Sequence, residues 1–231
     1  MIRALFFLIS ISAFSQSQVS ISVGYSGFAM SSLKNFQSEL EKQFLIKPKI
    51  INSFPSYYSF GAKYLQFFQP TYFIGGQFYF TNTGGRLSYS DYSGEQLADQ
   101  LLRNISIGAN IGKSFKSNEK FEFQLSLRLY YTNTNLDLTF KNRIGLVEDV
   151  ESIGFSSSNL ALEPNAAFVK WFGVFGIRLD GGYNISVLNG KLYLKNDNNV
   201  YLITGGNSEV VSDWSGYRVN LGVTCRLGVE K

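Results

Sequence analysis

Few residues in this chain could carry out catalysis or bind a metal. Its 231 residues include no histidine, and the single cysteine is Cys225. Serine–histidine catalysis and imidazole metal sites are therefore excluded, and an isolated cysteine is a poor nucleophile. No acidic run has the spacing of a calcium-binding loop. We expect no enzymatic activity, no cofactor and no metal.

The remaining chemistry lies in charged side chains that alternate with apolar ones. Around Glu122 and Arg128, every second residue from Phe121 to Tyr131 is leucine or aromatic. A period of two places the two sets on opposite faces of a β-strand. Applied along the chain, the alternation assigns eight charged side chains to one shared face: Lys63, Glu122, Arg128, Glu163, Arg178, Asp180, Arg218 and Arg226.

The elements that must position these residues are eight alternating stretches with connections of unequal length. Short connections cover 66–69, 116–120 and 171–172, whereas long ones cover 29–55, 83–101, 140–157 and 188–213. This asymmetry is typical of a closed eight-stranded antiparallel up-and-down transmembrane β-barrel, with short periplasmic turns and four long outer loops. The predicted strands are 18–28, 56–65, 70–82, 102–115, 121–139, 158–170, 173–187 and 214–228.

Alternation alone does not say which face is inside, because a soluble barrel shows it with the opposite orientation. Several stretches are long enough to cross a bilayer at a tilt. One face is large, aromatic and free of charge in this register, and the other mixes small residues with charges. We therefore predict that the apolar face contacts outer-membrane lipid and that the eight charges lie in the lumen.

A lumen of eight strands is just wide enough to be filled by its own side chains. Buried charges must be paired, so the arginines should bridge Glu122, Glu163 and Asp180. Five basic against three acidic positions leave a surplus of two, which ordered water or loop carboxylates could offset. We interpret the network as a structural plug, with an anion-favouring conduit as the alternative.

Several local signals refine this outline. Residues 31–44 have helical spacing behind Ser31 or Ser32 as N-cap, and residues 93–96 have capping-box spacing for a second helical turn. These segments should fold over the barrel mouth, unless they form a partner surface. Pro164 predicts a bulge near 163–165, and the facing of strand 56–65 stays open because both its sides are aromatic. Aromatic girdle positions follow at the two rims: Tyr25, Phe28, Phe67, Phe68, Tyr131, Trp171, Phe172, Trp214 and Tyr217.

The N-terminal segment has the features of a signal peptide. Arg3 precedes an apolar run, and Ala13-Phe14-Ser15 resembles a cleavage site, which predicts a signal peptide over 1–15 and one barrel domain over 16–231. The formal net charge of +4 is scattered, so we expect no nucleic-acid partner.

The C-terminal strand carries the residues of a family resemblance. Asn220, Gly222, Cys225 and Leu227 have the spacing of the assembly signal with which outer-membrane barrels end, although aromatics usually occupy the last two places and four residues follow here. Over 16–228 the chain thus resembles the small eight-stranded outer-membrane β-barrel family. The resemblance implies a bacterial outer-membrane location and insertion by the outer-membrane assembly machinery. Lipid A deacylases and palmitoyl transferases are similar in size but depend on histidine.

These observations predict a monomeric, non-enzymatic outer-membrane barrel with a structural or interaction role. The plugged barrel would anchor exposed loops that meet an unidentified ligand or partner. Two alternatives remain: a narrow channel for small or hydrophobic molecules, and a soluble secreted lipid-binding barrel.

Overall fold

The computed structural model describes residues 16–44, 46–68, 71–92, 94–118, 120–145 and 147–228. The predicted signal peptide over 1–15 lies outside these residues. Nearly all of the described chain is β-structure, with one α-helix. Within the described residues, no helix is both long and apolar enough to cross a membrane.

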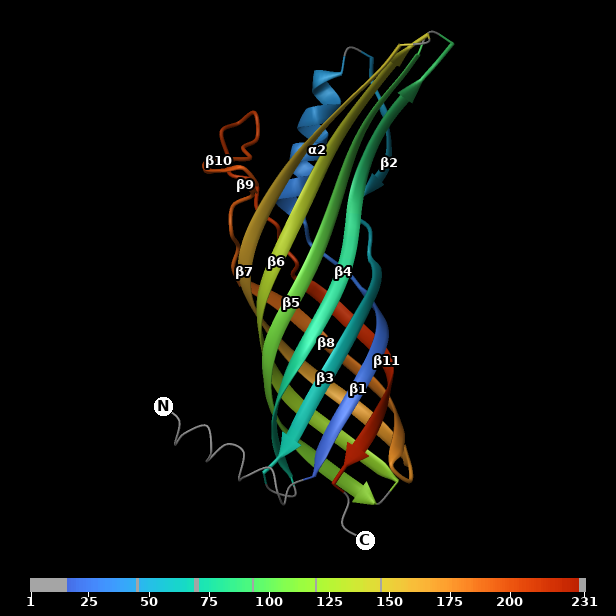
Figure 1. Cartoon of the computed structure of the whole chain (residues 1–231), viewed down its shortest axis with the longest axis vertical. Coiled ribbons are helices and arrows are strands. Elements are labelled where there is room, and N and C mark those ends of the chain that lie inside the picture. The colour runs from blue at the N-terminus through green and yellow to red at the C-terminus, as the bar shows by residue number, and fades with distance from the viewer. Residues whose placement is uncertain are drawn as a thin grey trace.

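Eight strands form a closed antiparallel ring (Figure 1). Each strand pairs with its neighbour in the chain, with one exception: β1 closes the ring by pairing with the last strand, Ser17 lying opposite Leu227. The predicted eight-stranded up-and-down barrel is therefore confirmed. The ring strands are β1 (Ser17–Ser26), β3 (Tyr57–Phe67), β4 (Tyr72–Ser90), β5 (Gly94–Asn118), β6 (Phe121–Ile144), β7 (Val147–Phe172), β8 (Phe175–Leu188) and β11 (Gly216–Leu227).

Four of these strands continue far beyond the ring. The predicted loops over 83–101 and 140–157 are wrong, because β4 and β5 pair as far as Ser90 opposite Glu95, and β6 and β7 as far as Ile144 opposite Val147. The helical turn predicted after residue 93 is wrong for the same reason. The alternation continues in these segments, but the outward residues change from apolar to polar. The sequence analysis therefore predicted loops where the structure has strands. We call this part of β4–β7 the projection (Figure 1).

The helical spacing of residues 31–44 correctly predicted a helix, α2 (Ser31–Gln43), and this helix lies against the inward face of the projection. Its N-cap is Met30, with a left-handed backbone (φ 49°), so the prediction of Ser31 or Ser32 as N-cap is wrong. Ser32 instead ties the helix to the last loop, because its hydroxyl donates to the Glu209 carbonyl and accepts from the Val211 amide. The helix packs into the outer mouth with an apolar cluster that includes Leu33, Phe36, Leu40, Leu87, Leu102, Leu136, Phe155 and Trp214.

The loops contribute three short strands. β2 (Lys49–Ser53) pairs with the extended part of β4. In the last loop, β9 (Tyr193–Leu194) pairs with β7 and with β10 (Asp197–Tyr201).

Pro164 does not produce the predicted bulge. The pairing of β6 with β7 continues through Leu127 opposite Pro164, and β7 keeps one register with β8 on both sides of the proline. The irregularity in β7 lies instead at Leu160 and Ala161. Pro164 is on the outward face, so the alternation is not broken and Glu163 keeps its inward direction.

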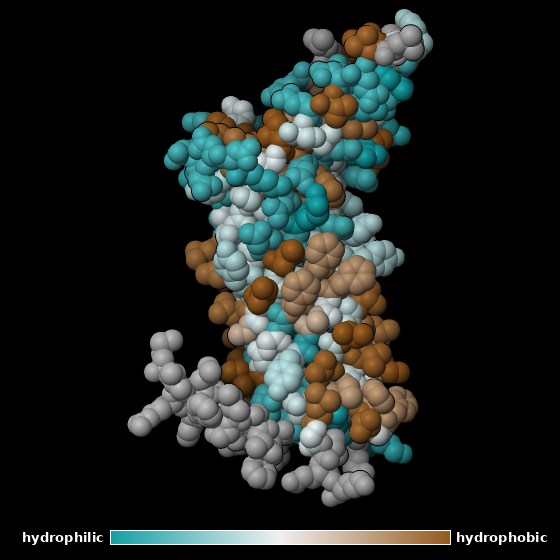
Figure 2. Space-filling view, in the orientation of Figure 1, coloured by the Kyte–Doolittle hydropathy of each residue, from teal (hydrophilic) through white to brown (hydrophobic). Residues whose placement is uncertain are grey.

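An apolar belt surrounds the ring below the projection. Its outward side chains are half-exposed aliphatic and aromatic residues such as Ile107, Leu127, Ile177 and Leu221. Figure 2 shows this hydrophobic surface on the lower part of the molecule and a hydrophilic surface above it. The expectation of no outward charge needs correction at the ends of the strands, because Arg103 and Asp137 lie above the belt and Lys113 and Lys170 lie below it. The zone of the outer surface without charged residues is therefore shorter along the barrel axis than the strands are.

Candidate functional site

The lumen gathers the eight predicted charged residues around three carboxylates. Alternation turns every second residue of each strand inward, and ring closure brings the strands to one axis. Glu122, near the short turns, is fully enclosed and accepts hydrogen bonds from Gln18, Ser114, Gln124 and Trp171. Arg226 also reaches it, with Nη2 3.5 Å from Oε2.

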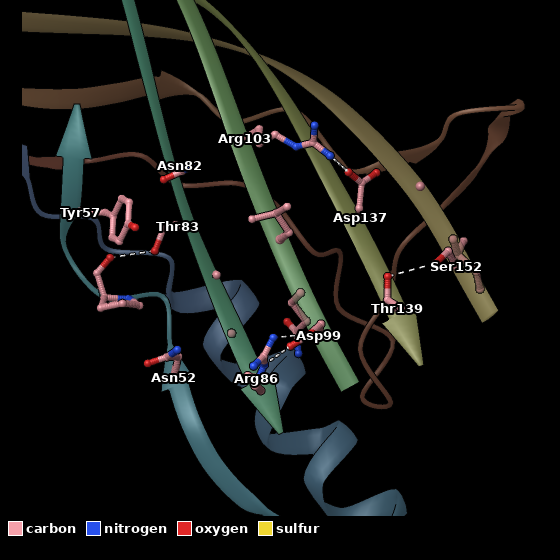
Figure 3. Close-up of a pocket in the computed structure, with 17 residues that line it drawn as sticks. Asn52, Tyr57, Asn82, Thr83, Arg86, Asp99, Arg103, Asp137, Thr139 and Ser152 are labelled. Atoms are coloured by element: carbon pink, nitrogen blue, oxygen red, sulfur yellow. Dashed lines mark hydrogen bonds and ion pairs between the residues drawn. The ribbon is translucent and has the colours of Figure 1, made fainter. Parts of the chain in front are cut away.

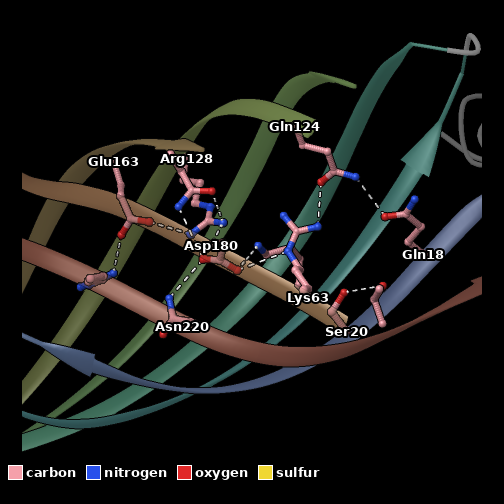
Figure 4. Close-up of polar contacts among 12 residues, drawn as sticks. Gln18, Ser20, Lys63, Gln124, Arg128, Glu163, Asp180 and Asn220 are labelled. Carbon is pink, nitrogen blue, oxygen red and sulfur yellow. Dashed lines mark hydrogen bonds and ion pairs between the residues drawn. The ribbon is translucent and has the colours of Figure 1, made fainter. Parts of the chain in front are cut away.

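Asp180 and Glu163 form the next two centres (Figure 4). The Asp180 carboxylate lies 3.3 Å from nitrogens of both Arg128 and Arg178 and 3.5 Å from Lys63 Nζ. Glu163 receives Arg128 Nη1 at 2.6 Å and Arg218 Nη1 at 2.9 Å. Arg128 therefore links two carboxylates. All three acids have cationic partners, as the alternation and the cost of unpaired buried charge predicted.

Two of the five cations also lie against aromatic rings. Arg218 lies 4.3 Å from the ring centre of Tyr79 and 5.1 Å from that of Tyr130, and Arg226 lies 3.7 Å from that of Trp171. Such faces stabilise a desolvated guanidinium. Among the described residues, no loop carboxylate enters the network, contrary to the expectation that one could. A cavity of about 20 Å³ beside Lys63, Arg128 and Asp180 leaves room for one water molecule.

A second polar arrangement lies on the outward face of the projection (Figure 3). It is a cleft of about 730 Å³ that begins where β2 leaves the wall and β3 starts. Two ion pairs cross its floor: Arg86 Nη2 lies 2.7 Å from Asp99 Oδ2, and Arg103 donates to Asp137. Its other polar lining residues include Asn52, Tyr57, Asn82, Thr139 and Ser152. We call this the outer cleft.

The charges of the outer cleft are locked in pairs. Hydrogen bonds from Lys195 and Arg103 hold the pKa of Asp137 below its usual value. The hydrogen bond with Asp99 raises the pKa of Arg86. The Asp137 carboxylate is therefore a weak base near neutral pH, and both ion pairs offer fixed donors and acceptors to a polar ligand.

The aromatic girdle is only partly where the sequence predicted it. Tyr25, Phe68, Tyr131, Phe172 and Tyr217 are exposed. Phe28 and Trp214 are instead buried in the apolar cluster under α2, with rings 4.9 Å apart, and Phe67 and Trp171 are buried at the turn end of the lumen. Strand parity could have found the last two, because Phe67 is in phase with Lys63 and Trp171 with Glu163. Phe28 and Trp214 lie outside the strands, where parity does not apply.

The four residues of the expected assembly signal lie along β11. Asn220 points inward and donates to Asp180 at 3.1 Å, and Leu227 is exposed on the outward face. Cys225 is partly exposed. Sequence reasoning missed the polar partners Gln18, Gln124 and Asn165 in the lumen, although the same parity marks them. It missed the outer cleft, because residues of the cleft such as Arg86, Asp99 and Ser152 come from segments that were predicted to be loops.

No family model and no curated protein matches the chain. Solved structures to which the chain is similar include Ail, the attachment invasion locus protein of Yersinia pestis, in complex with the heparin analogue sucrose octasulfate (18% identity, 92% of this chain, 99% of Ail, TM-score 0.42). Neisserial surface protein A is 12% identical over 92% of this chain and 97% of its own, with a TM-score of 0.47. The Escherichia coli outer membrane protease OmpT is 10% identical over 92% and 95%, with a TM-score of 0.28.

Likenesses at this level carry no conclusion about activity. The chain's own closed ring establishes that it has the fold of the small eight-stranded outer-membrane β-barrels, which its sequence resembles.

Proposed function

We propose that the chain is a monomeric bacterial outer-membrane barrel that anchors a binding surface and catalyses no reaction. One observation carries the proposal: the same four strands that complete the apolar belt continue above it with polar residues outward and an apolar side covered by α2. A belt without charge matches hydrocarbon, where an Arg or Lys at midplane would cost about 2–4 kcal/mol. The projection has the surface of a water-exposed sheet.

The outer cleft is the proposed binding site, and an oligosaccharide is the ligand class that fits it best. Its paired arginines and carboxylates, asparagines and hydroxyls suit the many hydroxyl groups of a sugar, and Tyr57 at its margin supplies an apolar face. Because the cleft lies directly above the belt, bound sugar would meet the barrel at the membrane surface.

Neither alternative function is favoured. The interior is charged, so it suits no apolar ligand of the kind a soluble lipid-binding barrel would carry. The lumen is filled by ion pairs and its outer mouth by the α2 cluster, which leaves no support for a channel. Insertion by the outer-membrane assembly machinery, through Asn220, Gly222, Cys225 and Leu227, belongs to the same proposal.

Topology can be tested by cysteine labelling in a C225S background. S152C, in the outer cleft, should react with a membrane-impermeant maleimide on intact cells. N118C, at a short turn, should react only after lysis. Equal labelling of both sites on intact cells would contradict the proposed orientation.

Ligand binding can be tested on an array of neutral and acidic oligosaccharides with the full-length barrel in amphipol. N82A combined with R103A should reduce retention on any positive sugar at least tenfold. K49A on β2, which lies outside the cleft, is the matched control. Equal retention of all variants would exclude the cleft as the binding site.

A further inference from the structure

A second cavity lies at the opposite end of the barrel, among the short turns. It measures about 640 Å³ and is lined by Lys116, Lys120, Lys170, Trp171, Phe172 and Arg226. We call it the basic cup. Lys170 and Phe172 belong to the outward face of β7, whereas Trp171 and Arg226 face the lumen. The cup therefore bends around the end of the wall, from the lipid side into the mouth of the barrel.

The basic cup holds more positive charge than the described residues neutralise. Among these residues, the one ion pair in the cup is the 3.5 Å contact of Arg226 with Glu122, and Glu122 is already bound by four neutral donors. Within the part of the chain that the structure describes, Lys116 Nζ has one polar partner, the neutral Gln16 side chain at 3.3 Å. Within the described chain, Arg226 Nε is buried without a hydrogen-bond partner. An anion in the cup would satisfy these groups.

The surroundings of the basic cup indicate where such an anion would come from. The turn that borders it exposes Phe172, Val174 and Phe175, each with about half of its surface accessible. An apolar turn of this kind is stabilised at the hydrocarbon boundary and not in bulk water. Lys170 Nζ lies 5.4 Å from the ring centre of Phe172 and 5.9 Å from that of Phe121. Lysine over aromatic rings at a membrane rim lies at the depth of lipid headgroups.

We propose that the basic cup binds the phosphate of an anionic phospholipid whose acyl chains lie along the outward face of β6 and β7. Lys120 and Lys170 would contact the phosphate first, and Arg226 would complete the site from the lumen side. Acyl chains would pack on Phe121 and Phe168, whose rings are 5.7 Å apart on this face. The inference rests on the proposed membrane location.

Tryptophan emission can test the proposal, because Trp171 lines the basic cup and the other tryptophan, Trp214, lies in the cluster under α2. In a W214F background, full-length barrel in phosphatidylcholine nanodiscs is compared with barrel in discs that contain increasing phosphatidylglycerol. We expect a saturable change in Trp171 emission. K116Q/K120Q/K170Q should weaken the apparent affinity at least tenfold, whereas K34Q/K47Q/K49Q, three equal charge removals at the far end, should leave it unchanged.

A barrel that inserts but lacks the lipid site can be distinguished from one that does not insert into a membrane. Each variant is first checked for heat-modifiable migration on gels, which reports a folded and inserted barrel independently of lipid charge. A folded barrel with the same emission in both lipids would overturn the lipid site. So would an equal response to inorganic phosphate in phosphatidylcholine discs, because the cup would then take a free anion.

Discussion

Glu163 illustrates how single residues make a charged interior stable. Its side chain is fully buried, and its two oxygens receive Arg128 and Arg218 from different strands. Removing one partner from such a pair leaves a buried charge uncompensated, which is far more costly than losing a surface pair.

Glu163→Gln should therefore lower the free energy of unfolding by about 3–5 kcal/mol, because two guanidinium groups lose their shared anion. Urea titration in detergent, followed by loss of heat-modifiable migration, measures the change. Asp99→Asn removes a carboxylate from the exposed pair with Arg86 and should cost about 0–1 kcal/mol. Equal effects of the two variants would contradict the buried network.

A single substitution at Leu127 can test whether the apolar belt contacts lipid. Its cross-strand neighbours are Ile111 and Pro164, so an arginine at this position has no polar group beside it. Leu127→Arg should cost about 2–4 kcal/mol and reduce membrane insertion, which cell fractionation measures. Thr139→Arg is the control, because it lies on the same face of β6 but beside Asp99 and Ser152 in the projection. Normal insertion of both variants would remove the lipid-facing assignment.

At the scale of elements, α2 acts as a cover for the apolar side of the projection. Its buried residues Leu33, Phe36 and Leu40 contact strands that would otherwise expose Leu87, Leu102 and Leu136 to water. The helix is held by side-chain packing and by few polar contacts, such as that of Gln37 with the Asn52 carbonyl at 2.7 Å.

Leu33→Asp should therefore release α2 without unfolding the barrel, because the ring keeps its own backbone ladder. Hydrogen exchange of residues 31–43 should become at least tenfold faster, whereas exchange in β1 and β11 should not change. Asn35→Asp, on the exposed face of the same helix, should leave both regions protected. Simultaneous loss of protection in helix and ring would show that the two are one cooperative unit.

At the scale of the whole molecule, the barrel is closed by different means along its axis. The outer mouth is filled by the α2 cluster, the middle by ion pairs, and the turn end by Leu65, Phe67 and Phe73 together with Trp171. We expect no steady unitary conductance in planar bilayers, even for Leu33→Asp, because the ion pairs remain when the cover opens. Discrete openings of constant size in the wild-type protein would favour the channel alternative.

The sequence by itself determined the number of ring strands, the approximate position of the short turns and the inward direction of the eight charged residues, although the turn predicted at 171–172 lies at 173–174. All three follow from local alternation, since a period of two is read from neighbouring residues. The same period continues to Phe67 and Trp171, but the predicted strands ended at residues 65 and 170, so both aromatics were assigned to the short turns at the rim.

Only the tertiary structure decided which charges meet and where the apolar belt ends. Gln18 and Glu122 are 104 residues apart and touch only because the ring closes, and Arg128 can join two carboxylates only when β7 and β8 are neighbours. The sequence did not reveal the projection, because its strands lose apolar residues on the outward face above the apolar belt although their backbone pairing continues. The local sequence pattern therefore indicates which face of a strand is buried. Which side chains pair, and how far the apolar belt extends along the barrel, depend on contacts between distant segments.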